Sequence, residues 1–455
     1  MHGSLNQRDL LRAELSQRDE SGFETSGVRV QIERLGGLNS LDPAGADGLL
    51  AELDDLPRSA EWPFVEPEGL DEIRAAGDWP EPVPFDLDDG YAEKINRAWT
   101  GRIAGNMLGK PVESGDEWTP KAIRTFLEAN AAWPLVDYFP AMTDTGAEHP
   151  DYRENWVEST AGRVDGSSRD DDVDYTILNL HVLRRVGPAF STGDVATAWL
   201  TMLPFLQTYT AERATIRNLI KGIAPGGAAR HRNPYREWIG AAIRADIFGY
   251  CCPGDPGRAA ELAYRDAVLS HTANGVYGEM WCAALIAASF TAPSAAAALQ
   301  TSLQVVPTGS RLSKAIRDTI AWHAEGLTWQ QTRDRIEEAF GHYGWVHTIN
   351  NAAVLAAGLL YGDGSFDQSI GLTVCGGWDT DSNGGTAGSV AGILAQRIDD
   401  HWVAPLHDHV RSAVFGYDGT SIGWLADQTV QVARSLRAGS SEPIDPAPGI
   451  PLDSW

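Results

Sequence analysis

The chain has 455 residues, of which 43% are hydrophobic and 22% are charged, and its formal net charge is −26. This composition is typical of a globular protein with a large core and excludes a mainly disordered chain. An acidic surface repels phosphate backbones and anionic lipids, so we expect neither nucleic acid nor a membrane as a partner. The four cysteines lack metal-ligand spacing and the first residues lack an apolar signal region, so we expect a cytoplasmic protein with reduced thiols.

The first 90 residues differ in composition from the rest of the chain. They are acidic and rich in proline, and they contain only short amphipathic pieces such as GADGLLAELDDL. From residue 91 onward the periodicity is helical and alternating strand patterns are nearly absent, which predicts an all-α domain. We therefore predict an accessory segment over residues 1–90, a main domain over residues 91–436 and a C-terminal tail over residues 437–455.

Two of the predicted helices carry glycine at every fourth position, in GRIAGNMLG (101–109) and in GGTAGSVAG (384–392). Each glycine inside a helix costs about 1 kcal/mol relative to alanine. Positions four apart share one face, so each series forms a ridge without side chains. The ridge serves either tight packing against another helix or the close approach of a ligand, for which Gly109 is a candidate.

Acidic residues gather at the ends of these ridges and at one further helix start. Glu113 follows the first ridge, Asp379 and Asp381 precede the second, and 170–172 is a run of three aspartates. The helix dipole favours acids at an N-terminus by about 0.3 to 1 kcal/mol, but three in a row repel one another. Oxygen ligands from several segments suit Mg²⁺, Mn²⁺ or Ca²⁺. The number of carboxylates indicates two ions.

Four segments together resemble the signatures of the ADP-ribosylglycohydrolases, a family that includes the hydrolase that reactivates ADP-ribosylated dinitrogenase reductase. In chain order they are GRIAGNMLGKPVE, SRDDDVDY, LSHTANGVYGEMWCAALIAASF and GGWDTDSNGGTAGSVAG, and the resemblance covers residues 91–436. It implies a compact all-α bundle that holds two divalent cations, Mg²⁺ or alternatively Mn²⁺, in a central cleft. The metal ligands that it implies are Asp170, Asp171, Asp172, Asp379, Asp381 and Ser382.

The chain departs from the family pattern at three places. Asn106 stands where the family usually has aspartate, Trp378 is inserted before Asp379, and Arg169 or Asp170 replaces the early threonine. The run 170–172 therefore has two possible registers, with either its first two or its last two aspartates as the metal-binding pair. These differences favour a substrate other than that of the typical family members.

The chemistry that the resemblance implies is cleavage of a glycosidic bond at a ribose anomeric carbon. Two divalent ions would orient the ribose hydroxyls and lower the pKa of a bound water. Glu113 and Asp171 are the catalytic candidates. Glu113 lies outside the aspartate clusters and could titrate separately, as an acid/base or water-orienting group, and its alternative role is to support the metal ligands.

Six further residues are candidates for substrate contact: His271, Trp345, His347, Trp378, Gly109 and Gly377. His271 matches the family's mid-chain histidine, and Trp345 with His347 stands at another helix start, where an aromatic ring could stack on a base. Capping or core packing is the alternative for each of these three. Trp378 either faces the cleft or packs behind its loop. Residues 114–166 are predicted to be an insertion that covers the cleft.

We expect a metal-dependent hydrolase that cleaves an N- or O-glycosidic bond. Its substrate would be an ADP-ribosyl group, free or on a modified protein, or a smaller ribosyl or nucleoside-like compound. A lyase or transferase using the same two ions, and a non-catalytic protein that binds ADP-ribose-like ligands, are the alternatives. Retention of the carboxylates argues against the non-catalytic alternative, because an unused cluster of like charges would be destabilising. The sequence leaves the oligomeric state open.

Overall fold

The computed structural model of the chain describes residues 5–115, 117–141, 154–439 and 444. Regular structure in these residues is almost entirely helical, and three isolated β-bridges are their only β pairing. The predicted all-α class is therefore confirmed. No helix in the described ranges combines the length and the apolar composition that crossing a membrane requires.

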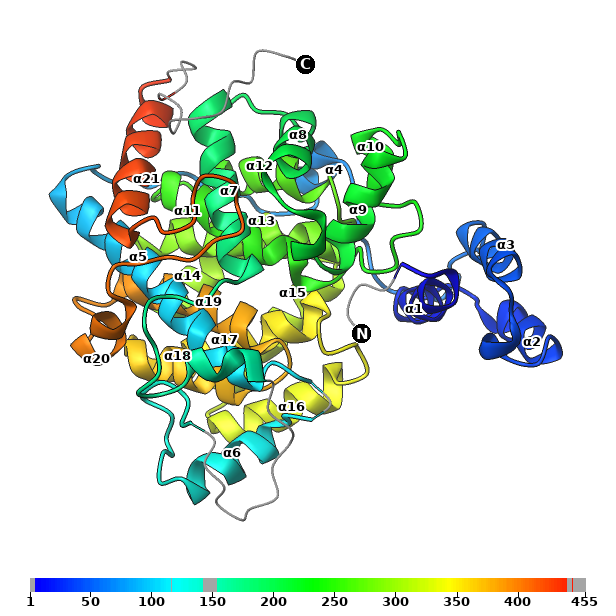
Figure 1. The fold of residues 1–455 in the computed structure, drawn as a ribbon, viewed down its shortest axis with the longest axis horizontal. Coiled ribbons are helices and arrows are strands. Elements are labelled where there is room, and N and C mark those ends of the chain that lie inside the picture. Colours follow the sequence, from blue (N-terminus) through cyan, green and yellow to red (C-terminus); the bar gives the residue numbers. More distant parts are fainter. Residues whose placement is uncertain (1–4, 116, 142–153, 440–443, 445–455) are drawn as a thin grey trace.

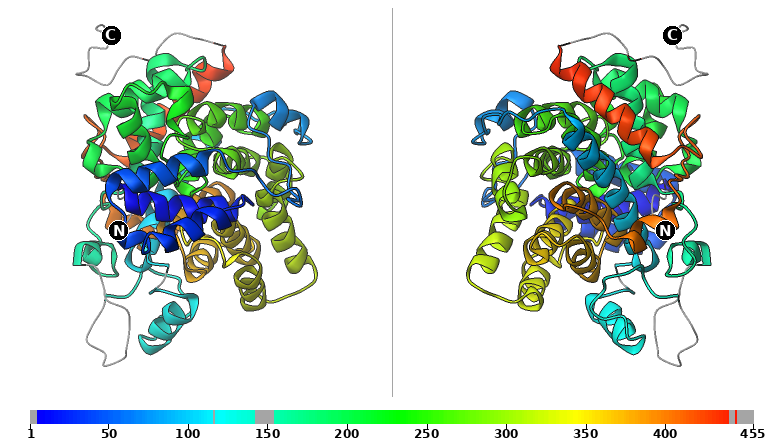
Figure 2. Two further views of the ribbon diagram at one scale, coloured as in Figure 1. Left: turned by 90° about the vertical axis from the view of Figure 1, so that its right-hand side faces the viewer. Right: turned by 90° about the vertical axis from the view of Figure 1, so that its left-hand side faces the viewer.

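The N-terminal segment forms four short helices, of which three lie together at the right of Figure 1 and face the viewer in the left view of Figure 2. Their bounds are α1 (Gln7–Glu20), α2 (Ser26–Arg34), α3 (Pro43–Asp54) and, closer to the main domain, α4 (Leu70–Ala75). Apolar side chains of α1 and α3, such as Leu11 and Leu53, form a small core of their own that also includes Ala211 and Tyr235 from the main domain.

Buried ion pairs also join this segment to the main domain. Glu66 accepts from the Arg311 guanidinium at 2.7 and 3.0 Å, and Arg311 also contacts Glu237 at 2.7 Å. Glu14 of α1 accepts from Arg236 at 2.7 Å. All five side chains are almost completely buried. Buried charges of residues 5–90 are therefore neutralised by charges of the main domain, in addition to the apolar contacts between them.

The main domain contributes the remaining helices. They are α5 (Asp89–Gly109), α6 (Pro120–Ala129), α7 (Asp171–Val186), α8 (Thr192–Met202), α9 (Thr210–Ile220), α10 (Pro225–Ala228), α11 (Asp246–Cys251), α12 (Pro256–Ala267), α13 (Ala273–Ser289), α14 (Ala295–Ser302), α15 (Arg311–Ala324), α16 (Trp329–Phe340), α17 (Thr348–Gly362), α18 (Phe366–Cys375), α19 (Thr380–Leu394), α20 (Asp400–Val403) and α21 (Ile422–Arg437). Short 3₁₀ turns lie at Leu38–Ser40, Lys110–Val112, Glu154–Ser159, Phe205–Gln207, Ile239–Arg244, Leu303–Val305 and Ala404–Leu406. Every residue of α13 is buried, because this helix is largely apolar and lies in the main core.

The two glycine ridges pack against each other in the centre of the bundle, where α5 and α19 run antiparallel (Figure 1). A Cβ added at Gly105 would lie 2.0 Å from the carbonyl oxygen of Gly384, and one at Gly101 would lie 2.2 Å from that of Gly388. At Gly109 the nearest atom would be the Thr380 carbonyl oxygen, at 2.1 Å. The ridges therefore serve helix packing, and Gly109 packs against the backbone at the start of α19.

The predicted insertion at 114–166 contains α6 and the turn at Glu154–Ser159, while residues 116 and 142–153 lie outside the described ranges. Its aromatic side chains pack on one another, with Phe126 stacked on Phe139 at 5.2 Å between ring centroids and Trp118 edge-on to both. Most of the predicted C-terminal tail also lies outside the described ranges. The domain boundaries remain predictions.

Candidate functional site

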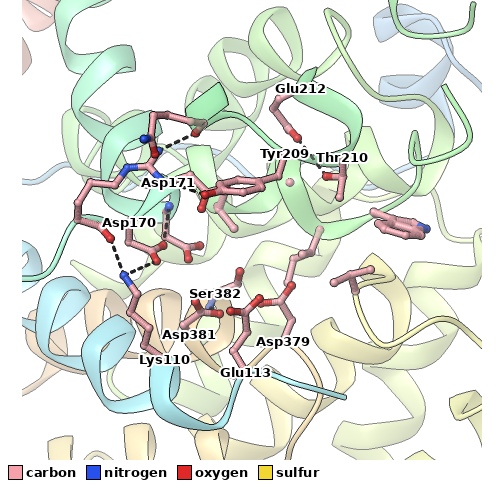
Figure 3. A pocket seen from close by; sticks show the side chains of 18 of the residues that line it. Lys110, Glu113, Asp170, Asp171, Tyr209, Thr210, Glu212, Asp379, Asp381 and Ser382 are labelled. Carbon is pink, nitrogen blue, oxygen red and sulfur yellow. Dashed lines mark hydrogen bonds and ion pairs between the residues drawn. The ribbon is translucent and has the colours of Figure 1, made fainter. Parts of the chain in front are cut away.

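A cavity of about 400 Å³ lies where the C-terminal end of α5 meets the N-terminal ends of α7 and α19 (Figure 3). Eight carboxylates line it: Glu113, Glu158, Asp170, Asp171, Asp172, Glu212, Asp379 and Asp381. Three basic side chains line it as well: Lys110, Arg169 and Arg411. The cavity therefore brings the three predicted acidic clusters into one site.

The helix pair α5–α19 positions two of these clusters. The Thr380 hydroxyl donates to the Gly109 carbonyl at 2.8 Å, so the end of one ridge is fixed to the start of the other helix. The turn at Lys110–Val112 then carries the chain to Glu113, beside Asp379 and Asp381 (Figure 3).

The carboxylates form two groups that share Asp381. In the first group an oxygen of each of Glu113, Asp379 and Asp381 lies within 4.8 Å of the others, and in the second the same holds for Asp170, Asp172 and Asp381. Carboxylate oxygens at this spacing suit hard divalent cations. Ser382, a predicted ligand, also lines the cavity.

In the run of three aspartates, the carboxylates of the first and the third lie together, while the metal-binding register remains a prediction. Asp170 is the N-cap residue of α7, and its Oδ1 accepts from the N–H of Asp172 at 3.1 Å, so these two carboxylates lie together. Asp171 lies between them in sequence and lines the cavity, but it belongs to neither carboxylate group. Asp174 lies outside the cavity lining and binds Arg169, at 2.7 Å, and Ser412.

Two polar residues of α5 and its following turn contact the Asp170–Asp172 pair. The Lys110 Nζ lies 2.9 Å from Asp170 Oδ2, and the Asn106 amide donates to Asp170 Oδ1 at 3.1 Å and to Asp172 Oδ2 at 3.0 Å. Burial alone would lower the pKa of Lys110, but the neighbouring Asp170 raises it, so the ammonium is charged. The protein itself thus places a positive charge, the Lys110 ammonium, in the site.

Burial and mutual repulsion dominate the electrostatics of the remaining carboxylates. Burial raises the pKa of Asp381 well above its usual range, and the charges of Glu113 and Asp172 raise it further. Burial and Asp170 likewise raise the pKa of Asp172, while burial raises that of Asp379. Asp170 is the exception, because Lys110 outweighs the effect of burial and holds its pKa below the usual range. A divalent cation would relieve the repulsion among these groups.

The opposite side of the cavity is partly apolar and includes residues that no sequence pattern had singled out. Trp345, a predicted substrate contact, lines this side together with Trp238, Ile239 and Val346. An isolated β-bridge between Trp238 and His347 holds the two aromatic segments together. Lys110 was not among the predicted site residues, although its position in GKPVE, between a glycine ridge and the catalytic candidate Glu113, could have indicated it.

Three of the predicted substrate contacts, all on or beside the glycine ridges, lie away from this cavity. The Trp378 side chain is 7% exposed and packs behind its loop, with the Arg333 guanidinium 4.0 Å from its ring centroid. Gly377 has φ +74° and packs on the Pro120 ring, and Gly109 contacts the Thr380 backbone. For Trp378 and Gly109, packing was the stated alternative, and the structure shows both residues packed.

The two predicted histidines are also outside the cavity lining. His347 is fully buried, caps α17 by accepting from the N–H of Ile349 at 3.2 Å, and stacks on Tyr343. Burial lowers the pKa of His347 to about 3, so the ring is neutral. His271 is buried beside Ser270 and lines a different cavity of about 290 Å³.

Comparisons with known proteins identify the family of the chain. The sequence matches the family of ADP-ribosylglycohydrolases over residues 87–439. Among solved structures, one described as an ADP-ribosylglycohydrolase-related protein complex is similar, with 18% sequence identity, a TM-score of 0.48, and coverage of 76% of this chain and 99% of that chain. Among curated proteins, none matches the chain.

Proposed function

Because the chain belongs to the ADP-ribosylglycohydrolase family and is a glycoside hydrolase on that ground, we propose that it is a metal-dependent hydrolase of ribosyl compounds. The bond that it cleaves is an N- or O-glycosidic bond at the anomeric carbon of an ADP-ribosyl group or of a smaller, nucleoside-like compound. The observation that carries the proposal is the pair of carboxylate groups that share Asp381 in one cavity.

The residues fit divalent cations, Mg²⁺ or Mn²⁺. The donor set consists of carboxylate oxygens, and Asp172 Oδ1 is buried without a hydrogen-bond partner in the described structure. An orphaned carboxylate oxygen is costly unless a cation or a donor meets it. Glu113, Asp379, Asp381 and Asp172 would hold the ions, with Asp170 beside them. When bound, these ions supply the charge that orients ribose hydroxyls and acidifies a water.

The chain's own side chains divide the remaining work. Asp171 faces the cavity outside both carboxylate groups, so it is the aspartate of its run that can exchange a proton with the leaving group. Glu113, at the junction of the turn and the cavity, is placed to orient the attacking water. Trp345 and Trp238 offer aromatic surface to the part of the substrate beyond the ribose.

The test is hydrolysis of a panel of ADP-ribosylated proteins, ADP-ribosyl compounds and simple ribosides, with products identified by mass spectrometry. We expect release of a ribosyl or ADP-ribosyl product that requires Mg²⁺ or Mn²⁺ and is lost in Asp381→Asn. The matched control is Asp427→Asn, which makes the same change at an exposed position of α21. Full activity of Asp381→Asn, or of the chelated wild-type enzyme, would refute metal dependence.

A further inference from the structure

The Asp170 carboxylate is already occupied by donors from the protein. Its Oδ1 accepts from the Asn106 amide and from the N–H of Asp172, both at 3.1 Å, and its Oδ2 lies 2.9 Å from Lys110 Nζ. A carboxylate offers about four acceptor positions, and three of them are used here. Asp170 therefore has little capacity left for a divalent ion.

The Lys110 ammonium is fixed in place on all sides. An ammonium has three N–H donors. Those of Lys110 meet Asp170, the Ser168 hydroxyl at 3.2 Å, and the Arg169 carbonyl oxygen. The side chain is only 8% exposed, and Pro111 follows it within the 3₁₀ turn. The positive charge therefore cannot swing away when an ion arrives.

The other carboxylate group has a different environment. Asp379 and Asp381 form no ion pair with a lysine, arginine or histidine in the part of the chain that the structure describes. The hydroxyl and the N–H of Ser382 lie near the Asp379 carboxylate and counter the effect of burial on its pKa, but both donors are neutral. Asp381 belongs to both groups, and the charges of Asp381 and Glu113 act on Lys110 after that of Asp170. The Lys110 ammonium forms its ion pair with Asp170, whereas Asp379 has no such partner in the described residues.

We propose that Lys110 takes the place of part of the second cation, so that the two metal positions are unequal. This inference rests on the metal dependence of the proposed function. The chain then binds one divalent ion tightly at Glu113, Asp379 and Asp381. A second ion, held by Asp381 and the free Oδ1 of Asp172, binds weakly because a fixed positive charge lies beside it.

The test is titration of the full chain with Mn²⁺ by calorimetry, together with electron paramagnetic resonance of the bound ion. Wild type should bind one Mn²⁺ tightly, with the six-line spectrum of an isolated ion, and a second at least about tenfold more weakly. Lys110→Met should strengthen the second site by about tenfold or more and give the spectrum of a coupled pair. Lys94→Met is the matched control, because this lysine lies on α5, which leads into the turn of Lys110, and donates to the Ile393 carbonyl.

A second variant keeps the test decisive if Lys110→Met does not fold. Asn106→Asp adds a carboxylate and retains Lys110, so it should also strengthen the weak site. Two equally tight Mn²⁺ ions with a coupled spectrum in wild type would overturn the proposal while leaving metal dependence intact. If neither wild type nor Asp379→Asn binds any Mn²⁺, the metal dependence itself is contradicted.

Discussion

Replacing Gly105 by alanine should separate the two central helices. The new Cβ would lie 2.0 Å from the Gly384 carbonyl oxygen and 2.6 Å from its carbonyl carbon. Ordinary contacts of a Cβ begin near 3.4 Å. Both obstructing atoms are backbone, so no rotamer change removes the clash, and α5 and α19 must move apart by more than 1 Å, roughly the difference between these distances.

The expected cost is at least about 3 kcal/mol, the upper end of the range for overpacked cores. For a domain of this size the entropy of unfolding converts 1 kcal/mol into roughly 1.4 °C, so the melting temperature should fall by about 4 °C or more. Since the same helix pair places Glu113 beside Asp379, affinity for Mn²⁺ should fall as well.

The matched control is Gly385→Ala on α19. Its Cβ would meet its nearest atom, the Arg102 Nη1, at 3.4 Å, which is an ordinary contact. This variant should melt near the wild-type temperature and keep its Mn²⁺ affinity, as measured by differential scanning calorimetry and by titration. If Gly105→Ala behaves like Gly385→Ala, the helices tolerate separation and the account of the ridges is wrong.

Three further changes have distinct expected outcomes. Trp378→Ala should cost about 3 to 5 kcal/mol in urea unfolding, because it removes a packed ring, and leave KM unchanged; a raised KM with normal stability would place the ring in the cavity. Burial and Glu237 raise the pKa of Glu20 to about 7, so the wild-type protein loses stability as pH rises from about 4.5 through 7. Glu20→Gln should therefore be more stable than wild type by about 3 kcal/mol near pH 8, and this difference should shrink at lower pH. A difference in unfolding free energy that does not change with pH would contradict the assignment. Asp171→Asn should lower kcat about 100-fold with unchanged Mn²⁺ binding, and loss of that binding would make it a ligand.

Sequence periodicity was sufficient for the helical class, and the convergence of the acidic clusters followed from the chemistry of oxygen ligands and from the family resemblance. The four-residue glycine spacing in 101–109 and 384–392 left packing and ligand approach as alternatives, because either one needs a face without side chains. Only the antiparallel register, with Gly105 opposite Gly384, decides for packing. That register is a long-range property that neither local segment contains.

Several details of the site could not be predicted from the sequence, because they depend on the local backbone conformation. The pairing of Asp170 with Asp172 depends on the extended backbone of an N-cap residue, which turns its side chain back over the first turn of the helix. The position of Trp378 depends on its left-handed backbone, at φ +65°, and on Arg333 from another helix. His347 resembled a ligand-binding residue because a helix cap and a substrate contact both occur at helix starts.

The regular spacing of the two glycine ridges fixes the register of α5 and α19, and with it the distance between the carboxylates at their ends. Gly101, Gly105 and Gly109 meet Gly388, Gly384 and Thr380 one helical turn at a time, and bulkier residues lie between them. The helices can therefore slide past each other only by a whole turn, about 5.4 Å, which is too far to keep Glu113 beside Asp379. A single residue inserted within α5, between Gly105 and Gly109, would turn the segment that leads to Glu113 by about 100° around the helix axis. The chemistry of the cavity is thus tied to the count of residues on either side of the ridges, and sequence length in these two segments is as constrained as sequence identity.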